Sequence, residues 1–324
     1  MNLLQLAKAA AAIKPNHSIL IYGPPKTGKT KLAGTAAKIK EVTRIFWFDL
    51  ENGVETLLGM GLTDEELAKI TVVKIADTRD NPIAIETMLK ALTSKTSVKI
   101  CEQHGKVNCA ECAKASAPFI SFYLKDLTHN DLLVIDSGSQ LGDSALGAAC
   151  LGKESMFKPT FDEYGMVNKW LGDICSVIQQ CANTNFVVLT HEIALEDDEG
   201  KDKFFPLMGS KAFSMKCAKY FGTVVYVHKK LNKHVAGSSS TYLGDRMSGS
   251  RVNAKIEKQS EPDMRAILIE GGILKPGATD QMQTSSESAP QVQTVEEKKD
   301  VAPTSNVKPL SLKDRLAQKK QANA

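Results

Sequence analysis

A short motif, GPPKTGKT at Gly23–Thr30, constrains this chain more than any other feature of its sequence. It matches the pattern G-x-x-x-x-G-K-[ST] and stands between an apolar run at Ser18–Tyr22 and a helical pattern at Lys29–Ile39. Glycines in such a loop let successive backbone N–H groups point inward, and the positive end of the next helix adds to their attraction for phosphate. The motif therefore predicts a strand, a phosphate-binding loop and a helix in direct succession.

The residues of this loop have expected places around a nucleotide. Lys29 is expected beside the β- and γ-phosphates of ATP, and the Thr30 hydroxyl is expected to hold Mg²⁺. A glycine-rich turn without a ligand is the alternative. The residues expected to bind the nucleotide are Gly23, Pro24, Pro25, Lys26, Thr27, Gly28, Lys29 and Thr30.

Apolar runs alternate with helical patterns along the chain. Strands are expected over 18–22, 43–48, 70–75, 131–135, 185–190 and 223–228, with a last edge strand over 265–269. The clearest helical patterns cover 29–39, 84–94 and 165–181. Continuous Val, Ile and Leu runs separated by helices are typical of a parallel sheet covered on both faces. We therefore expect an α/β fold with a mainly parallel sheet flanked by helices.

The composition of the chain changes near residue 275. Residues 1–275 are expected to form the folded domain, whereas residues 276–324 are rich in Thr, Ser, Gln, Glu and Pro and predict a disordered tail. Within that tail, Lys308–Lys320 carries three Leu and five Lys or Arg. This pattern predicts a short basic helix that binds a partner, such as a single-strand-binding or replication protein. A solvated, solubilising end is the alternative.

Charge and hydropathy narrow the class of protein. The chain has 41 Lys and Arg against 37 Asp and Glu, so bulk charge does not require nucleic acid and any such site needs local clustering. No apolar run approaches the roughly 18–20 residues that cross a bilayer. Met1–Ile13 is interpreted as a short amphipathic helix rather than a signal peptide. We expect a cytoplasmic protein without a membrane partner.

Three polar residues follow buried strands where a nucleotide site needs them. Asp136 ends the run DLLVID and is expected to orient Mg²⁺, with capping of the next helix as the alternative. Glu51, in FWFDLENG, is the expected general base for an attacking water, and Asp49 competes for that role. His191, after NFVVLT, is expected to sense the γ-phosphate. Simple capping or backbone bonding is the alternative for each.

A group of cysteines and one histidine lies between the third and fourth expected strands. The spacing Cys101-x2-His104-x4-Cys109-x2-Cys112 gives two tight ligand pairs across a short loop. Thiolates with one imidazole favour Zn²⁺ over Mg²⁺. An Fe–S cluster, or cysteines without a metal, are the alternatives. We expect a structural zinc site that holds together an otherwise coreless insertion over about 99–115.

The nucleotide motifs, in this order, resemble the RecA-type ATPase core. The strings VIDSGSQL, VVLTHE, FPLMGSKA and KYFGTVVYVHK look more closely like the compact phage ATPases called AAA-domain or RecA-like proteins, which include recombinases linked to single-strand annealing. The resemblance covers residues 15–270. For a phage protein, the expected location is the bacterial host cytosol.

The resemblance implies roles for residues and for neighbouring copies of the chain. Lys29 and Thr30 would contact phosphate and Mg²⁺, Asp136 would orient the ion, Glu51 would activate water and His191 would act as the sensor. Members of the family form rings or filaments with ATP between subunits, so a homo-oligomer is expected. A basic residue of the neighbour then completes the site. The candidates for that residue are Arg246, Arg251, Lys229 and Lys230, with Arg251 preferred and solvated loop charges as the alternative.

The resemblance also places single-stranded DNA on two loops. The first, 147–160, contains Lys153, Phe157 and Lys158, and the second, 196–206, contains Lys201, Lys203, Phe204 and Phe205. Basic residues beside aromatic rings suit a single strand, because charge tracks its backbone and rings stack on its bases. Acidic residues in the second loop make DNA binding there less favourable. Its two phenylalanines are alternatively residues of the apolar core.

These patterns together predict a DNA-stimulated ATPase with ATP, Mg²⁺ and Zn²⁺, acting in phage recombination or single-strand annealing. A replicative helicase or helicase loader is the first alternative. A nucleotide-gated adaptor that recruits replication proteins through the tail is another. A nucleotide kinase is disfavoured, because no Arg-rich lid is visible in the sequence.

Overall fold

A computed structural model describes residues 17–78, 80–154, 156–196, 199–231, 233–238, 245–250 and 259–274 of the chain. The expectations for the first 13 residues, for the tail from 276 with its helix at 308–320, and for Arg251 lie outside these residues.

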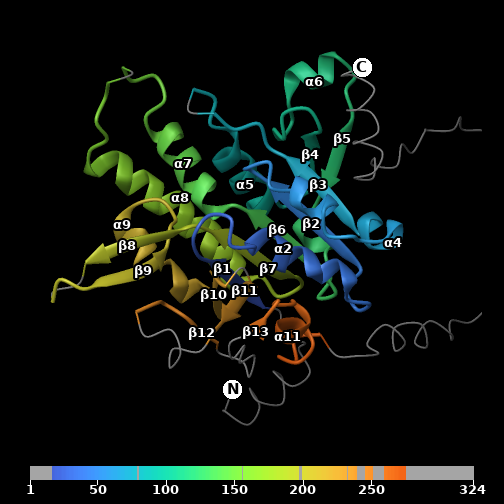
Figure 1. The fold of residues 1–324 in the computed structure, drawn as a ribbon. Coiled ribbons are helices and arrows are strands. Elements are labelled where there is room, and N and C mark those ends of the chain that lie inside the picture. Colours follow the sequence, from blue (N-terminus) through green and yellow to red (C-terminus); the bar gives the residue numbers. More distant parts are fainter. Residues whose placement is uncertain are drawn as a thin grey trace, which may run out of the picture.

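A nine-stranded sheet forms the centre of the fold (Figure 1). Its longest continuous part has the order β10-β1-β7-β6-β2-β3, and all five neighbouring pairs in it are parallel. β11, β12 and β13 join antiparallel beside β10. The predicted mainly parallel α/β fold is therefore confirmed. The strands are β1 (Ser18–Tyr22), β2 (Arg44–Asp49), β3 (Ile70–Lys74), β6 (Asp131–Asp136), β7 (Asn185–Thr190), β10 (Thr223–Lys230), β11 (Lys233–Gly237), β12 (Gly249–Ser250) and β13 (Gln259–Ser260).

Both faces of the sheet are covered by helices. Along β1, Leu20 and Tyr22 belong to one apolar core while Ile19 and Ile21 belong to the other, as the alternation of a strand dictates. The first core is closed by α5 (Ile83–Thr93), α7 (Gly138–Ala149), α8 (Phe161–Gln180), α9 (Lys211–Ser214) and the 3-10 turns η2 (Leu124–Asp126) and η3 (Cys217–Tyr220). The second is closed by α2 (Lys29–Gly34), η1 (Thr35–Lys38), α3 (Glu55–Leu58), α4 (Asp64–Ala68) and α11 (Arg265–Leu268).

The predicted insertion contains its own hairpin. β4 (Val98–Cys101) pairs antiparallel with β5 (Phe119–Phe122), and the short helix α6 (Ala110–Lys114) lies between them in sequence. The insertion is not coreless as expected: Ile100, Ile120 and Phe122 belong to the first core of the sheet. The Phe122 ring packs edge-on against Phe46 and Phe48, with centroids 5.3 and 5.5 Å apart. Aromatic side chains of β5 thus tie the hairpin to β2.

The second loop expected to bind DNA is also more ordered than predicted. β8 (Glu192–Glu196) and β9 (Asp202–Pro206) pair as an antiparallel hairpin, which projects from the body of the molecule (Figure 1). The acidic and basic residues of its far end disguise the alternation of a strand in the sequence.

The expected edge strand at 265–269 is wrong, because these residues form the helix α11. A short apolar run fits either a strand or a buried helical turn. Here packing favours the helix, because Ile267 and Leu268 are fully buried against the second face, and the Asp263 carboxylate accepts the Arg265 N–H at 2.8 Å just before it. The helix predicted from Gly165 begins earlier, at Phe161, because Thr160 and Glu163 form a capping box.

Candidate nucleotide site

The loop between β1 and α2 needs glycine at two positions. Gly23 has φ 151°, and a Cβ there would lie 2.0 Å from the Val227 carbonyl oxygen of β10. Gly28 has φ 94°, and a Cβ there would lie 2.6 Å from Nδ1 of His234. Both glycines are therefore required by backbone conformation and by close packing. Val227 of β10 and His234 of β11 pack closely against this loop and so restrict its backbone conformation.

Lys29 lies at the centre of the loop. Its Nζ donates to the carbonyl oxygens of Gly23 at 3.0 Å and Pro24 at 2.8 Å, and only 8% of the residue is exposed. Burial lowers the pKa of this ammonium to about 8, although the charges of Glu51 and Asp136 act in the opposite direction. The fold thus holds a buried cation at the point where the motif predicts phosphate.

Two buried carboxylates lie beside Thr30. The Thr30 hydroxyl donates to Oδ2 of Asp136 at 3.1 Å, and Asp136 is the register partner of Asp49 across the β2–β6 pair. Burial, together with the charge of Asp49, raises the pKa of Asp136 to about 7. Burial also raises the pKa of Asp49, whose Oδ2 is buried without a hydrogen-bond partner among the described residues. Hydroxyl and carboxylate oxygens that form no close ion pair with any described residue fit Mg²⁺.

Gly53 keeps the space beside these carboxylates open. Its N–H donates to Oδ1 of Asp49 at 2.8 Å. A Cβ on Gly53 would lie 2.8 Å from Oδ2 of Asp136 and 3.6 Å from the Thr30 hydroxyl. The turn after β2 therefore lies against the expected magnesium position without filling it.

Glu51, in the same turn, faces His191. Oε2 of Glu51 lies 3.3 Å from Nε2 of His191, and the Ser137 hydroxyl donates to the other carboxylate oxygen. Burial opposes ionisation of Glu51, but the hydrogen bonds from His191 and Ser137 outweigh it and lower its pKa. Glu51 is therefore an ionised carboxylate at neutral pH, which a proton acceptor must be.

His191 connects this carboxylate to the loop lysine and to the β8–β9 hairpin. Its Nδ1 lies 3.4 Å from Nζ of Lys29, and its backbone N–H donates to the Ser139 hydroxyl at 2.8 Å. That hydroxyl donates in turn to the Leu207 carbonyl at 3.0 Å, and the Leu207 N–H donates to the His191 carbonyl at 2.8 Å. The imidazole and the base of the hairpin are thus held by one network.

Comparison with known proteins identifies the family. A family model described as an AAA domain matches residues 15–253, which is more than half of the chain. The chain belongs to this AAA-domain family. It is a P-loop ATPase with a nucleotide-hydrolysing core.

Two solved structures resemble this AAA-domain ATPase at the level of fold. A RadB recombinase is 15% identical, with a TM-score of 0.36 over 69% of this chain and 81% of that one. An ATPase from the type III secretion system of pathogenic bacteria is 16% identical, with a TM-score of 0.40 over 68% of this chain and 53% of that one. No curated protein matches the sequence. Similarity this low carries no information on the substrate or partner of the ATPase.

The basic residues expected to act on a neighbouring subunit have different surroundings. Arg246 is held within its own chain, where its guanidinium stacks 4.7 Å from the Phe204 ring centroid and 4.9 Å from that of Tyr226. Lys229 and Lys230 are exposed at the end of β10. Phe204 is therefore a packing residue at the base of the hairpin.

The first loop expected to bind DNA has one lysine already paired. Nζ of Lys153 lies 2.5 Å from the Glu163 carboxylate and 4.3 Å from the centroid of Phe157. Glu163 also caps α8, so Lys153 stabilises the start of that helix. Large apolar side chains around this loop are exposed, led by Phe161 at 97% and Met156 at 87%.

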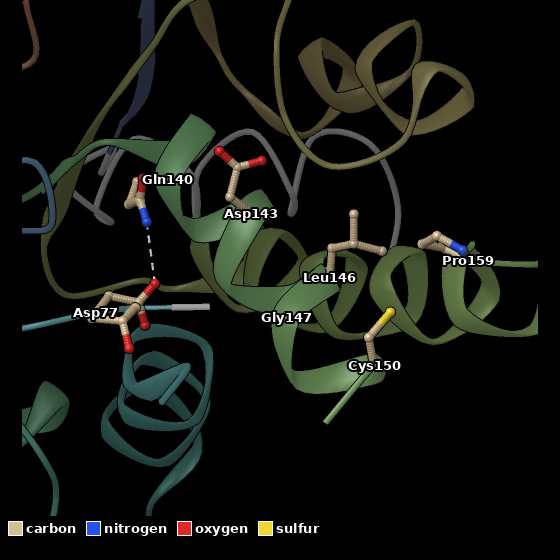
Figure 2. A pocket seen from close by; sticks show the side chains of 8 residues that line it. Asp77, Gln140, Asp143, Leu146, Gly147, Cys150 and Pro159 are labelled. Carbon is tan, nitrogen blue, oxygen red and sulfur yellow. Dashed lines mark hydrogen bonds between the residues drawn. The ribbon is translucent and has the colours of Figure 1, made fainter. Parts of the chain in front are cut away.

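A cavity of about 280 Å³ lies beside α7 (Figure 2). Asp77, Gln140 and Asp143 line its polar side, and the Gln140 amide donates to Asp77 at 3.2 Å. Burial, with the charges of Glu51 and Asp77, raises the pKa of Asp143. The charge of Glu51 in the nucleotide site therefore acts on Asp143 in the cavity wall, although none of the nucleotide-site residues lines the cavity.

Sequence reasoning missed two contacts of the site. His234 of β11 places Nδ1 2.7 Å from the Thr27 carbonyl oxygen, and Ser137 binds Glu51. A hairpin turn between the runs YVHKK and KHVAG is the signal for β11, and nothing in the sequence indicates its register against the loop.

The four predicted metal ligands come together in the structure. One ligand atom from each of Cys101, His104, Cys109 and Cys112 can be chosen so that all lie within 4.8 Å of one another.

Of the helices in the part of the chain that is described, none has the length and apolar character to span a membrane.

Proposed function

We propose that this chain is a RecA-type ATPase that acts on single-stranded DNA in phage recombination by single-strand annealing. The observation that carries the proposal is the position of His191. Its ring touches both Lys29 and Glu51, and the β8–β9 hairpin starts at the next residue. A change at the γ-phosphate would reach the hairpin through one residue.

The chemistry proposed is attack of water on the γ-phosphorus of ATP. Glu51 accepts a proton from the water as its oxygen forms a bond to phosphorus, and the bond from phosphorus to the ADP oxygen breaks. Lys29 and the loop N–H groups stabilise the phosphate charge. Thr30 and Asp136 would hold Mg²⁺, which neutralises charge on the β- and γ-phosphates when bound. His191 positions Glu51 and reports the state of the site.

We further propose that a homo-oligomer forms, as a ring or filament, and that Arg251 of a neighbouring copy completes the site. An arginine at the transferring phosphoryl group is worth roughly 10³–10⁵ in turnover in other ATPases and GTPases. Substitution Arg251→Ala is then expected to suppress turnover, and mixing it with the Glu51→Gln variant is expected to restore part of it.

The proposed DNA surface combines the β8–β9 hairpin with the loop before α8. Lys203 is exposed on β9, and Phe205 lies half-buried beside it. Met156, in the loop before α8, and Phe161, the first residue of α8, expose large apolar side chains. Positive charge for the DNA backbone and apolar groups for the bases are the two requirements of a single-strand surface.

ATP turnover with and without single-stranded DNA tests the proposal, with Lys29→Ala as the blank. The double variant Lys201→Ala/Lys203→Ala is expected to lose DNA stimulation but keep basal turnover. The matched control is Lys38→Ala/Lys40→Ala, which removes the same charge at the opposite end of the strands, where η1 leads into β2. Turnover that is indifferent to every single-stranded DNA tested would refute the proposal.

A further inference from the structure

The Cys/His cluster lies outside the nucleotide chemistry, and its geometry points to a resident metal. In Figure 1 the elements that carry it, β4, α6 and β5, lie on a different side of the molecule from the β8–β9 hairpin. All three cysteines are at most 4% exposed, and they pack with Ala117 and Phe119 as a small separate cluster. Every described cysteine is a free thiol.

The distances within the cluster fit a tetrahedral ion. Nδ1 of His104 lies 3.8 Å from Sγ of Cys101, 3.7 Å from that of Cys109 and 3.3 Å from that of Cys112. Zinc bonds of about 2.3 Å to sulfur and about 2.0 Å to nitrogen place tetrahedral ligands about 3.5 Å apart. One nitrogen atom thus faces three sulfurs at the separation that a shared zinc ion requires.

The backbone around the cluster also has the shape of a metal knuckle. Gly105 and Asn108 adopt positive φ, at 71° and 51°, so the chain turns sharply after one ligand and before another. The Cys112 N–H donates to the Cys109 sulfur, as the N–H groups of a turn do toward a thiolate. This hydrogen bond helps to orient the Cys109 sulfur within the turn.

We infer that Cys101, Cys109, Cys112 and Nδ1 of His104 bind one structural Zn²⁺, which fixes the connection between β3 and α5. Four protein ligands complete the tetrahedron, so the ion has no position open for a substrate. The inference is independent of the proposed function in DNA recombination.

The knuckle is bonded directly to the end of β3 and to α5. The His104 carbonyl accepts the Ala76 N–H at 3.0 Å, and the Gly105 carbonyl accepts the buried Thr87 hydroxyl at 2.8 Å. A Cβ on Gly105 would lie 2.5 Å from the Lys74 carbonyl oxygen. The backbone of a metal ligand therefore supports the end of a central strand.

The supported connection continues into the wall of the cavity beside α7. Asp77 follows Ala76 and accepts from the Ala84 N–H and the Ser144 hydroxyl, each at 2.8 Å. It also accepts from Gln140, as Figure 2 shows. The proposed zinc site is thus connected to α5 and α7 by hydrogen bonds of the residues 76–77 that follow β3.

Metal analysis of the purified full chain tests the site. We expect one equivalent of zinc per chain, and replacement by Co²⁺ is expected to give the intense visible bands of tetrahedral cobalt with a thiolate charge-transfer band. Cys112→Ser and His104→Ala are expected to weaken zinc retention against a chelator at least tenfold. Cys150→Ser and Cys181→Ser, cysteines outside the cluster, serve as matched controls and are expected to keep the metal.

Hydrogen exchange of the wild-type chain tests the structural link without any variant. Removal of zinc is expected to accelerate exchange at residues 99–119 and at the Ala76 amide, and to leave the loop 23–30 unchanged. Absence of bound metal from fully reduced protein, an iron–sulfur spectrum, or a His104→Ala variant with undiminished zinc affinity would overturn the site. Unchanged exchange at Ala76 would overturn its link to β3.

Discussion

The nucleotide site and the Cys/His cluster both bury polar side chains, but their surroundings differ. Asp136 ends β6, and Lys29 and Thr30 begin α2 after the loop from β1, so all three lie beside a sheet whose two faces are packed into large apolar cores. The three cysteines form a small apolar cluster of their own, against which Ala117 and Phe119 pack. Burial of apolar area is the dominant favourable term in folding, so the two sites have unequal support.

Because of this difference, we expect the nucleotide and the inferred zinc ion to have different effects on the protein. The sheet holds the charges of the nucleotide site in place although their burial is unfavourable, as the shifted pKa values of Lys29 and Asp136 show. The Cys/His cluster itself has a small apolar surrounding, so the inferred zinc would add to the stability of this part of the fold when bound. Activity should therefore depend on the first site, and local order on the second.

The largest effect expected is loss of turnover in Lys29→Ala. In the proposed mechanism the Lys29 ammonium is the main protein cation at the transferring phosphoryl group, so its removal should bring ATP hydrolysis below detection. The melting temperature should fall by no more than about 2 °C, because the substitution also removes a buried charge. A malachite-green phosphate assay and calorimetry measure the two quantities. A large fall in melting temperature would contradict the claim that the sheet alone supports this site.

The substitution Glu51→Gln should separate binding from chemistry. An amide keeps the size of the side chain but cannot accept the proton of water, so turnover should fall about 10²–10⁴-fold. Nucleotide affinity should change little, because Glu51 lies across from Lys29 without touching the loop backbone. Single-turnover hydrolysis and fluorescent-nucleotide binding give the two values. The control is Glu55→Gln, an exposed residue of the following helix. Equal losses in both variants would exclude Glu51 as the base.

The sequence predicted the parallel strands and the nucleotide loop well, because both depend on local information. Continuous apolar runs mark buried strands, and GPPKTGKT carries its own geometry. The contact between Glu51 and His191 was not predicted, although each was singled out separately. It depends on how β2 and β7 are ordered in the sheet, and residues 140 positions apart carry no local signal of that order.

The errors in prediction have a common physical cause. The run RAILI at 265–269 is too short for its periodicity to distinguish a strand from a helical turn, and packing on the second face decided for the helix. The strands β4 and β5 were not predicted, because each has only four residues and so shows too little alternation to indicate a strand. Tertiary contacts, with Phe46 and Phe48, hold that hairpin in place.

The pH dependence of nucleotide binding tests the electrostatic side of the comparison. Asp136 has a pKa of about 7 in the ligand-free protein and must ionise to bind Mg²⁺. Affinity for Mg²⁺–nucleotide should therefore rise about tenfold from pH 6 to pH 8, with release of a proton near pH 7. Calorimetry in buffers of different ionisation enthalpy measures that proton, and Asp136→Asn should abolish its release.

The same shift has a consequence for the stability of the ligand-free protein. Because the folded-state pKa of Asp136 is raised from 3.8, its contribution to stability is fully present below about pH 4 and is lost as the pH rises through about 7. Chemical unfolding of wild type and Asp136→Asn across this range isolates the contribution. A wild-type stability that rises with pH relative to the variant would contradict the assignment.

Removal of the inferred zinc should have the smallest effect on turnover. It is therefore the most direct test of whether the Cys/His cluster and the nucleotide site are independent. Opening of one local unit leaves the cooperative core of a protein folded, so ATP hydrolysis should fall by no more than about threefold while the knuckle loses order. The remaining loss would come through Ala76 and the β3–α5 connection, which the His104 carbonyl holds at 3.0 Å. Turnover is measured after chelation and after zinc is restored, with Lys29→Ala as the blank. Complete and reversible loss of hydrolysis on chelation would mean that the two regions form one cooperative unit, and that the apolar cores of the sheet do not hold the nucleotide site by themselves.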